Sequence, residues 1–413
     1  MSAETSAPST FLPLDEALQR IRAGLSPVEG YQQLALRDAL GRVLAEDVLS
    51  PIDVPAYTNS AMDGYAVRAA DLSADAEATL TVVGTAFAGQ PYEGTVEAGG
   101  AVRIMTGAML PAGADTVVMQ EDAERDGDAL TLRPGHKPGQ HVRHAGEDIA
   151  AGGTALAAGK RLRPSEIGLL ASLGVPEVRV RRRLRVAFFS TGDELRSIGE
   201  PLEEGQIYDS NRYTLHGMLT RLGVEQLDMG VIPDRREAVE AAFQQAAAVA
   251  DVVITSGGVS VGEADYVKET LDSLGEVGFW KIAMKPGKPL AFGRVADAVF
   301  FGLPGNPVSA MATFYQVVQP ALRHMLGEDE VLPVRLQARC AERLKKRPGR
   351  QDFQRGVLRH DETGQLVVAS TGAQGSHVLS SMSRANCFIV LPADSGDVEA
   401  GGMVEVQPFE GLV

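Results

Sequence analysis

The chain has 413 residues, enough for roughly two to four domains, and an ordinary globular composition of 44 % hydrophobic and 23 % charged residues. Its 39 basic and 54 acidic residues give a net charge of −15, which argues against nucleic acid or an anionic membrane surface as a partner. No apolar stretch reaches membrane-spanning length and no signal peptide is recognisable, so a cytoplasmic protein is expected. The seven histidines and the two cysteines, Cys340 and Cys387, show no metal-ligand spacing.

The N-terminal part predicts helices separated from one another in the chain. Residues 14–23 have acidic residues in the first turn and a glycine after the last residue, as amphipathic helices do. A second helix is expected near 34–45 and a third over 164–173. We expect residues 12–55 and 147–183 to form one discontinuous N-terminal α/β domain.

Between those two segments, short apolar runs alternate with glycine turns. The runs lie at 80–83, 101–104, 116–119 and 129–132. This pattern is typical of hairpins, so residues 56–146 are predicted to be a small inserted β domain.

Strands and helices alternate regularly over residues 184–329. Strands are expected at 185–190, 224–230, 251–255, 277–284 and 298–302, and helices at 211–222, 235–249, 264–274 and 307–325. The alternation predicts a doubly wound, mostly parallel sheet covered by helices on both faces. Such sheets bind ligands outside the carboxyl ends of their strands.

The last part of the chain, residues 330–413, returns to short strands. They are expected at 334–340, 353–359, 366–370, 387–391 and 403–406. A C-terminal β-barrel-like domain is therefore predicted, and the whole chain is expected to be a multidomain α/β protein.

Three acidic residues follow strands of the predicted parallel sheet. They are Glu194, Asp234 and Asp265. A glycine-rich loop that begins at Ser256, Gly257 and Gly258 opens the next helix, where backbone N–H groups favour an oxyanion. Because carboxylates repel a bare phosphate, a Mg²⁺ ion between them is expected, and the local chemistry indicates metal-assisted handling of a phosphate or pyrophosphate.

Lysines lie in a turn stiffened by proline and glycine. Lys285 and Lys288 belong to the run Lys285-Pro-Gly-Lys-Pro289, which is followed by Pro304-Gly-Asn-Pro307. If 277–284 is a strand, Lys281 and Lys285 project to the same side of it. This cationic turn in an acidic protein predicts a pocket for a specific anion.

Each of these features has a simpler interpretation when taken alone. The glycine loop fits an ordinary strand-to-helix turn, a single acid fits a helix N-cap, and the lysines fit a solvated turn. Residues 59–66 fit a hinge, and Arg355 fits the surface of a strand. Convergence of cations, glycines and carboxylates at one edge of one sheet favours a site instead.

Seven segments together resemble the molybdopterin molybdenumtransferase family, which includes the bacterial MoeA proteins and the E domain of gephyrin. They are residues 59–66, 106–111, 191–195, 208–211, 256–262, 285–289 and 302–307. The resemblance covers nearly the whole chain. It implies an enzyme that inserts molybdenum from molybdate into adenylylated molybdopterin, releases AMP and works as an elongated homodimer. Its site would combine the α/β domain of one subunit with β segments of the other.

The resemblance also implies roles for individual residues. Glu194, Asp234 and Asp265 would hold Mg²⁺ and, with Asp63, act in catalysis. Those expected to bind molybdate or the pterin phosphate are Lys281, Lys285, Lys288, Arg355 and Ser376. Those expected near the cleft or in further substrate contacts are Thr106, Arg143, Asp148, Ser256, Gly257, Gly258, Pro304 and Pro307. An upstream adenylyltransferase and downstream molybdoenzyme chaperones are the expected protein partners.

Two other functions remain open from the residues alone. The same α/β scaffold serves a molybdopterin adenylyltransferase or a nucleotide pyrophosphatase, although the β domains on both sides favour the molybdenumtransferase. A non-catalytic scaffold is the second alternative, since gephyrin-type domains also bind receptor tails.

Overall fold

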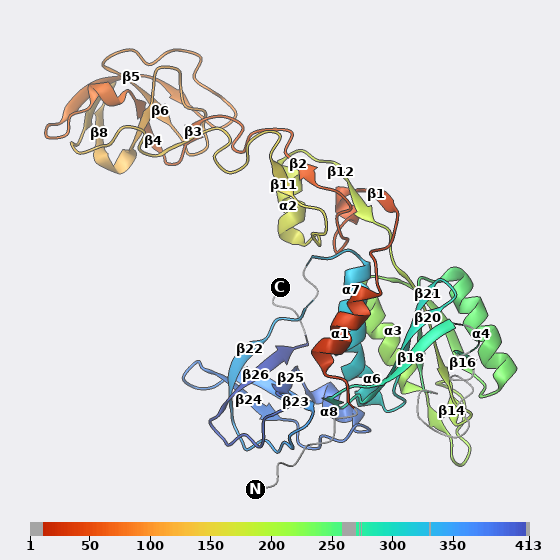
Figure 1. Ribbon diagram of the computed structural model, residues 1–413. Helices are drawn as coiled ribbons and strands as arrows, with labels where there is room; N and C mark the ends of the chain where they lie inside the picture. The colour runs from red at the N-terminus through yellow and green to blue at the C-terminus, as the bar shows by residue number, and fades with distance from the viewer. Residues whose placement is uncertain (1–10, 258–269, 272, 274, 330–331, 410–413) are drawn as a thin grey trace, which may run out of the picture. The chain divides into compact units, whose positions relative to one another are not determined.

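The computed structural model describes residues 11–257, 270–271, 273, 275–329 and 332–409 (Figure 1). Their contacts divide them into two compact units. The first unit contains residues up to Gln32, Gly41–Val43 and the chain from Arg181 onward, and the second contains Gln33–Leu40 and Leu44–Val180. No helix among the described residues has both the length and the apolar character needed to cross a membrane.

The second unit is built mainly on a six-stranded sheet of order β7-β4-β6-β5-β9-β8. Its strands are β4 (Gly64–Val67), β5 (Ala78–Ala86), β6 (Gly100–Ile104), β7 (Thr116–Met119), β8 (Ala123–Asp126) and β9 (Ala129–Leu132). The predicted inserted β fold is confirmed. Outside this sheet the unit has the helix α2 (Pro164–Ser172) and the short strands β2 (Val48–Leu49), β3 (Asn59–Ser60), β10 (Val142–Arg143) and β11 (Thr154–Leu156).

The prediction of a helix over 34–45 is wrong. The strand β1 (Tyr31–Ala35) pairs with β12 (Glu177–Arg181), and only a short 3-10 turn, Leu36–Asp38, follows it. Gly41 has a φ of 76°, a left-handed conformation that ends any helix there. Leu36 and Leu44 are instead buried in a small core of their own. Tertiary pairing therefore overrides the local helical pattern.

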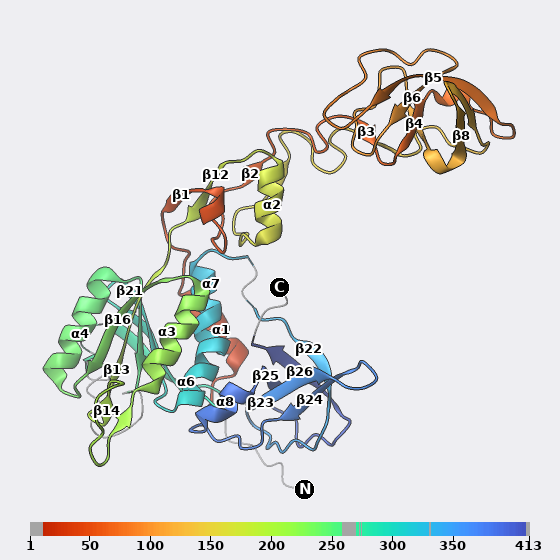
Figure 2. The same cartoon turned by 180° about the vertical axis from the view of Figure 1, so that it is seen from behind.

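The first unit contains the predicted α/β sheet, with strand order β16-β13-β17-β21-β20-β18 (Figures 1 and 2). Its strands are β13 (Arg185–Thr191), β16 (Glu225–Ile232), β17 (Val252–Ser256), β18 (Gly275–Lys281), β20 (Pro289–Val295) and β21 (Ala298–Leu303). The first four in spatial order are parallel, and β20 is antiparallel to both its neighbours. The mostly parallel sheet is confirmed.

Helices cover both faces of this sheet. Successive residues of a strand point to opposite faces, so neighbouring residues of β13 contact different helices. Phe188 packs in the larger core with α1 (Leu14–Ala23), α3 (Ser210–Leu222), α6 (Pro307–Thr313) and α7 (Gln319–Met325). Phe189 packs on the other face against α4 (Arg236–Val249). Five residues between α6 and α7, Phe314–Val318, form a π-helical turn, which widens the helix just before Pro320, a residue without an N–H.

The position of α1 differs from the predicted grouping. Leu14, Ala17 and Ile21 are buried in the core of the α/β sheet, and the backbone N–H of Leu12 donates to the carbonyl of Lys281 at 2.8 Å. This helix therefore packs with the α/β sheet. The division into four domains remains a prediction.

A closed five-stranded barrel follows the α/β sheet in the same unit. Its strands are β22 (Leu336–Cys340), β23 (Gln351–His360), β24 (Leu366–Ser370), β25 (Cys387–Leu391) and β26 (Met403–Pro408). The helix α8 (Leu379–Arg384) lies between β24 and β25 in the chain. Pairing of β23 with both β24 and β25 closes the ring. The barrel-like C-terminal fold is confirmed. Cys340 and Cys387 are buried in this part of the chain as free thiols.

The segment predicted as one strand over 277–284 belongs to two sheets. The strand β18 ends at Lys281, and the short strand β19 (Met284–Lys285) pairs with β23 of the barrel. Lys281 and Lys285 therefore do not lie on one strand, and that prediction is wrong. The lysine turn instead joins the α/β sheet to the barrel.

Candidate functional site

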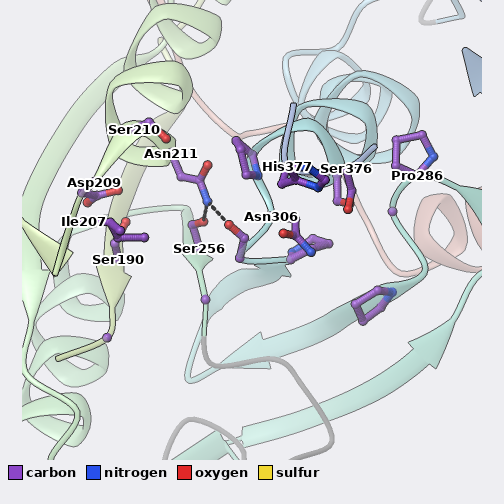
Figure 3. Close-up of a pocket in the computed structure, with 18 of the residues that line it drawn as sticks. Ser190, Ile207, Asp209, Ser210, Asn211, Ser256, Pro286, Asn306, Ser376 and His377 are labelled. Carbon is purple, nitrogen blue, oxygen red and sulfur yellow. Dashed lines mark hydrogen bonds between the residues drawn. The ribbon is translucent and has the colours of Figure 1, made fainter. Parts of the chain in front are cut away.

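A cavity of about 1110 Å³ lies at the carboxyl ends of β13, β16, β17 and β21 (Figure 3). These strand ends meet because parallel strands end at one edge of the sheet. The remaining wall comes from the lysine turn, the N-terminus of α6 and the barrel loop Gln374–His377. Two short paired strands, β14 (Leu195–Arg196) and β15 (Ile207–Tyr208), border the same cavity.

Carboxylates form one rim of this cavity. Glu194 and Asp234 both line it, as their positions after β13 and β16 predict. The backbone N–H of Asp234 donates to the carboxylate of Asp193 at 3.2 Å. Partial burial, with the nearby charges of Asp193 and Glu194, raises the pKa of Asp234. Crowded negative charge of this kind favours a bound cation.

Glycines allow the chain to pass close to itself beside these acids. Gly257 has a φ of 91°, and a Cβ there would lie 2.7 Å from the carbonyl oxygen of Thr191. A Cβ on Gly192 would meet a carboxylate oxygen of Glu194 at 2.6 Å. Any larger residue at Gly257 would therefore displace the end of β13.

Asn211 connects three elements at the floor of the cavity. Its Nδ2 donates to the hydroxyl of Ser256 and to the carbonyl of Gly305, both at 2.7 Å (Figure 3). It therefore ties the start of α3 to the end of β17 and to the loop before α6. No role was predicted for Asn211, although it belongs to one of the resembling segments.

Buried polar atoms without partners face the same region. The hydroxyls of Ser190 and Thr191 and the Oδ1 of Asn211 have no hydrogen-bond partner among the described residues. All three residues line the cavity. Since buried polar groups are costly when unpaired, these atoms are suited to contact a ligand or water.

The lysines are placed differently from one another. Lys285 and Lys288 line the cavity, whereas Lys281 is exposed at the end of β18 and does not line it. The Nζ of Lys285 lies 3.2 Å from the carboxylate of Asp352, a buried residue of β23. Lys288 lies with its Nζ 5.0 Å from the ring centroid of Phe11.

The barrel supplies a loop that closes one side of the cavity. Ser376 lines the cavity, and its carbonyl accepts from the backbone N–H of Val308 at 3.1 Å. Arg355, predicted to bind an anion, is only 1 % exposed and does not line the cavity. Its guanidinium donates to the carbonyl of Gly375 at 3.1 Å and to the hydroxyl of Ser381 at 3.0 Å. Burial lowers the pKa of Arg355 to about 10.

Arg355 therefore holds the loop that carries Ser376. The arginine that lines the cavity is Arg350, at the start of the same barrel segment. Sequence reasoning missed Arg350, although it lies in the basic run Lys345-Lys-Arg-Pro-Gly-Arg350.

The other predicted residues fall into three groups. Ser256, Gly257, Pro304 and Pro307 line the cavity. Asp265 and Gly258 lie outside the described residues. The residues of the second unit are Asp63, Thr106, Arg143 and Asp148.

Within the second unit, Asp63 and Thr106 are in contact. The Oδ1 of Asp63 accepts from the backbone N–H and from the hydroxyl of Thr106, both at 2.7 Å. These hydrogen bonds lower the pKa of Asp63.

Two of the carboxylates that line this cavity, Glu194 and Asp234, are candidates to hold a magnesium ion. The described residues contain no group of three or more acidic, histidine or cysteine side chains placed to hold a metal. Mg²⁺, however, commonly binds one or two carboxylates and completes its shell with water and phosphate oxygens. Glu194 and Asp234, with the raised pKa of the latter, fit that limited requirement.

The fold and the cavity define a multidomain α/β protein with one cavity lined by both carboxylates and lysines. Profiles of known families match three parts of the chain: the MoeA N-terminal region (domain I and II) at 12–174, a probable molybdopterin binding domain at 187–324, and the MoeA C-terminal region (domain IV) at 337–409.

Individual relatives match nearly the whole chain. A Haemophilus influenzae protein named molybdopterin molybdenumtransferase is 48 % identical over 405 residues, which cover 98 % of this chain and 100 % of that protein. A Nostoc protein of the same name is 38 % identical, over 88 % of this chain and 85 % of its own. A crystal structure of a molybdopterin biosynthesis MoeA protein from Pyrococcus horikoshii has a TM-score of 0.83 at 30 % identity, covering 97 % of this chain and 100 % of that one.

The chain belongs to the MoeA family. The resemblance predicted from the sequence segments is therefore confirmed. So is the predicted class of function, an enzyme of molybdenum cofactor biosynthesis, and neither the adenylyltransferase or pyrophosphatase nor the scaffold alternative is favoured.

Proposed function

We propose that this protein inserts molybdenum from molybdate into adenylylated molybdopterin and releases AMP in a Mg²⁺-dependent reaction. The observation that carries the proposal is a single cavity lined both by the carboxylates of Glu194 and Asp234 and by the ammonium-bearing turn at Lys285 and Lys288. The carboxylates suit a cation and the lysines suit an oxyanion, so one cavity could hold both. The names of the full-length relatives support the same reaction.

In this proposal Glu194 and Asp234 would hold Mg²⁺ at the pyrophosphate of the substrate. Asp265, which lies outside the described residues, is the third proposed ligand. When bound, the ion would neutralise charge that builds on the phosphate oxygens as the bond to AMP breaks. The unpaired hydroxyls of Ser190 and Thr191 supply further polar contacts beside it.

Molybdate would bind on the opposite side, at Lys285, Lys288 and Ser376. Molybdate is a tetrahedral dianion, and ammonium and hydroxyl donors suit its oxygens. Arg355 would act by positioning Ser376, since its guanidinium is committed to the loop. A direct role for the exposed Lys281 rests on the resemblance alone.

The glycine loop and the proline turns would shape the pocket for the substrate. The proposed residues are Ser256, Gly257, Gly258, Pro304 and Pro307. Roles for Asp63, Thr106, Arg143 and Asp148 in the second unit are proposed from the resemblance, with Asp63 as a catalytic residue. A homodimer, a cytoplasmic location, and exchange with an adenylyltransferase and with molybdoenzyme chaperones are proposed on the same ground.

The test is AMP release by the purified protein from adenylylated molybdopterin. Release is expected to require both molybdate and Mg²⁺. Lys285→Ala should raise the molybdate concentration needed for half-maximal release by about tenfold, since it removes one charge from the pocket. Lys137→Ala, at an exposed position of the second unit, is the matched control.

Two results would contradict the proposal. AMP release that ignores molybdate would indicate a pyrophosphatase. Consumption of ATP with free molybdopterin would indicate an adenylyltransferase.

A further inference from the structure

A second cavity of about 570 Å³ adjoins the site and is not explained by the proposed reaction. It is lined by Lys285, Lys345, Lys346, Arg347, Pro348, Arg350, Asp352 and Asp397. Lys285 and Arg350 line both this side cavity and the main cavity. The two spaces therefore share cationic side chains.

The side cavity has an excess of positive charge. Five of its lining side chains are cationic and two are carboxylates. Both carboxylates are already engaged: Asp352 pairs with Lys285 at 3.2 Å, and Asp397 pairs with Arg343 at 2.8 Å. In a protein of net charge −15, such a local excess attracts a small anion selectively.

A buried lysine fixes the loop that carries these cations. Lys346 is 5 % exposed, and its Nζ donates to the carbonyls of Arg347, Ala393 and Ser395 at 3.0–3.2 Å. Its backbone N–H also donates to Asp397 at 2.7 Å. All three N–H donors of the ammonium are used, so Lys346 holds the loop in place. Its charge adds positive electrostatic potential to the side cavity without a direct contact to a ligand.

The neighbouring cations are left available. Lys345 and Arg347 are exposed and line the side cavity. The charge of Lys345 helps to lower the pKa of Asp397, but no side-chain hydrogen bond or ion pair of 4.0 Å or less holds either cation among the described residues. A rigid loop with free donors loses less entropy on binding an anion than a mobile one does. Charge, anchoring and available donors occur together at the edge of the main cavity.

We propose that the side cavity is a capture subsite for a tetrahedral oxyanion, which Lys285 and Arg350 link to the main cavity. This proposal rests on the proposed function, which supplies the identity of the anion. Free molybdate and a phosphate group of the pterin substrate are both tetrahedral oxyanions, so either could occupy the subsite. Capture would raise the local concentration of the anion beside Lys285 without any bond being made or broken.

The test compares the full-length double variant Lys345→Gln/Arg347→Gln with wild type. Equilibrium dialysis against molybdate, without pterin, should reveal two classes of site in wild type. The double variant should lose one class or weaken it about tenfold, as expected when two cationic contacts to a dianion are removed. Arg359→Gln, an exposed position at the far end of β23, should keep both classes.

A second arm identifies the source of the anion. AMP and inorganic phosphate replace molybdate as probes in the same dialysis. If the double variant weakens their binding and leaves molybdate binding intact, the subsite serves a phosphate group. If no probe distinguishes the double variant from Arg359→Gln, the proposal is overturned.

Dialysis involves no turnover, so its result is independent of the reaction assay. A protein that binds two classes of molybdate but never releases AMP would retain the subsite and lose the proposed function. A protein that releases AMP normally but has a single class of molybdate site, unaffected by the loop substitutions, would keep the proposed function and lose the subsite.

Discussion

The carboxyl group of Asp234 illustrates how the proposed binding role conflicts with stability. Its pKa is raised by partial burial and by the charges of Asp193 and Glu194. The folded state therefore holds the proton more tightly than the unfolded chain, and the free energy of unfolding falls as the pH rises above the ordinary value of 3.8. At neutral pH without a cation, the ionised group destabilises the fold.

Asp234→Asn should consequently stabilise the protein in the presence of a chelator. We expect a gain of about 0.5 kcal/mol at pH 7, reduced by salt, because the repulsion is partly screened by solvent. The gain should disappear well below the ordinary pKa of 3.8, where the carboxyl group is protonated in both states. Urea unfolding at the two pH values measures it. An equal gain from Asp297→Asn, in an exposed turn, would rule out the local explanation.

Asn211 provides a second prediction for a single side chain. Asn211→Ala removes two hydrogen bonds and leaves the buried Ser256 hydroxyl and Gly305 carbonyl without that donor. A loss of about 2 kcal/mol in the free energy of unfolding is expected, together with lower activity. The neighbouring exposed substitution Ser210→Ala should change stability by less than about 0.5 kcal/mol. Equal effects of the two in urea unfolding would show that the contacts made by Asn211 do not matter.

The sequence predicted some of these residues and missed others for identifiable reasons. Glu194 and Asp234 follow neighbouring parallel strands, and topology alone brings them to one cavity. Arg355 and Arg350 lie in the same basic stretch, so composition cannot tell which one is buried against a loop and which one lines the cavity. That distinction depends on the packing of the barrel.

Secondary-structure elements were predictable where the local pattern and the tertiary environment agree. The strands β13 and β17 are short, largely apolar runs whose residues are almost all buried, and both were expected. The strand β20 was missed because it forms a tight hairpin with β21 and contains polar and glycine positions. The helix expected at 34–45 failed because a distant strand, β12, pairs with that segment.

The turn after β17 brings Gly257 close to the end of β13. Gly257→Ala should cost more than about 1 kcal/mol, because the left-handed φ disfavours a side chain and the new Cβ would collide with the carbonyl of Thr191. The comparison substitution is Gly217→Ala. Gly217 lies on the exposed side of α3, away from the ends of the helix, and a Cβ there meets nothing within 4 Å. It should stabilise the protein by about 0.5–1 kcal/mol.

Thermal or urea unfolding of both glycine variants makes this comparison. We expect the two changes in the free energy of unfolding to have opposite signs, and Gly257→Ala alone to lose activity. A harmless Gly257→Ala would mean that the close approach of β13 and β17 at the cavity is not needed.

At the scale of the whole molecule, one long-range connection completes the cavity. The strand β19 pairs with β23, so the lysine turn lies against the barrel, and Lys285 reaches Asp352, 67 residues further along the chain. The loop at Ser376 approaches α6 in the same way. Sequence periodicity carries no information about such pairings, which is why the contribution of the barrel was predicted least well.

Anomalous diffraction from crystals containing tungstate, Mn²⁺ and AMP would locate both proposed ions in one experiment. Tungstate replaces molybdate and Mn²⁺ replaces Mg²⁺, because each gives a strong element-specific signal. We expect a tungsten peak beside Lys285 and Lys288 and a manganese peak beside Glu194 and Asp234, both within one cavity. Peaks in separate regions of the protein, or manganese bound away from both carboxylates, would contradict it.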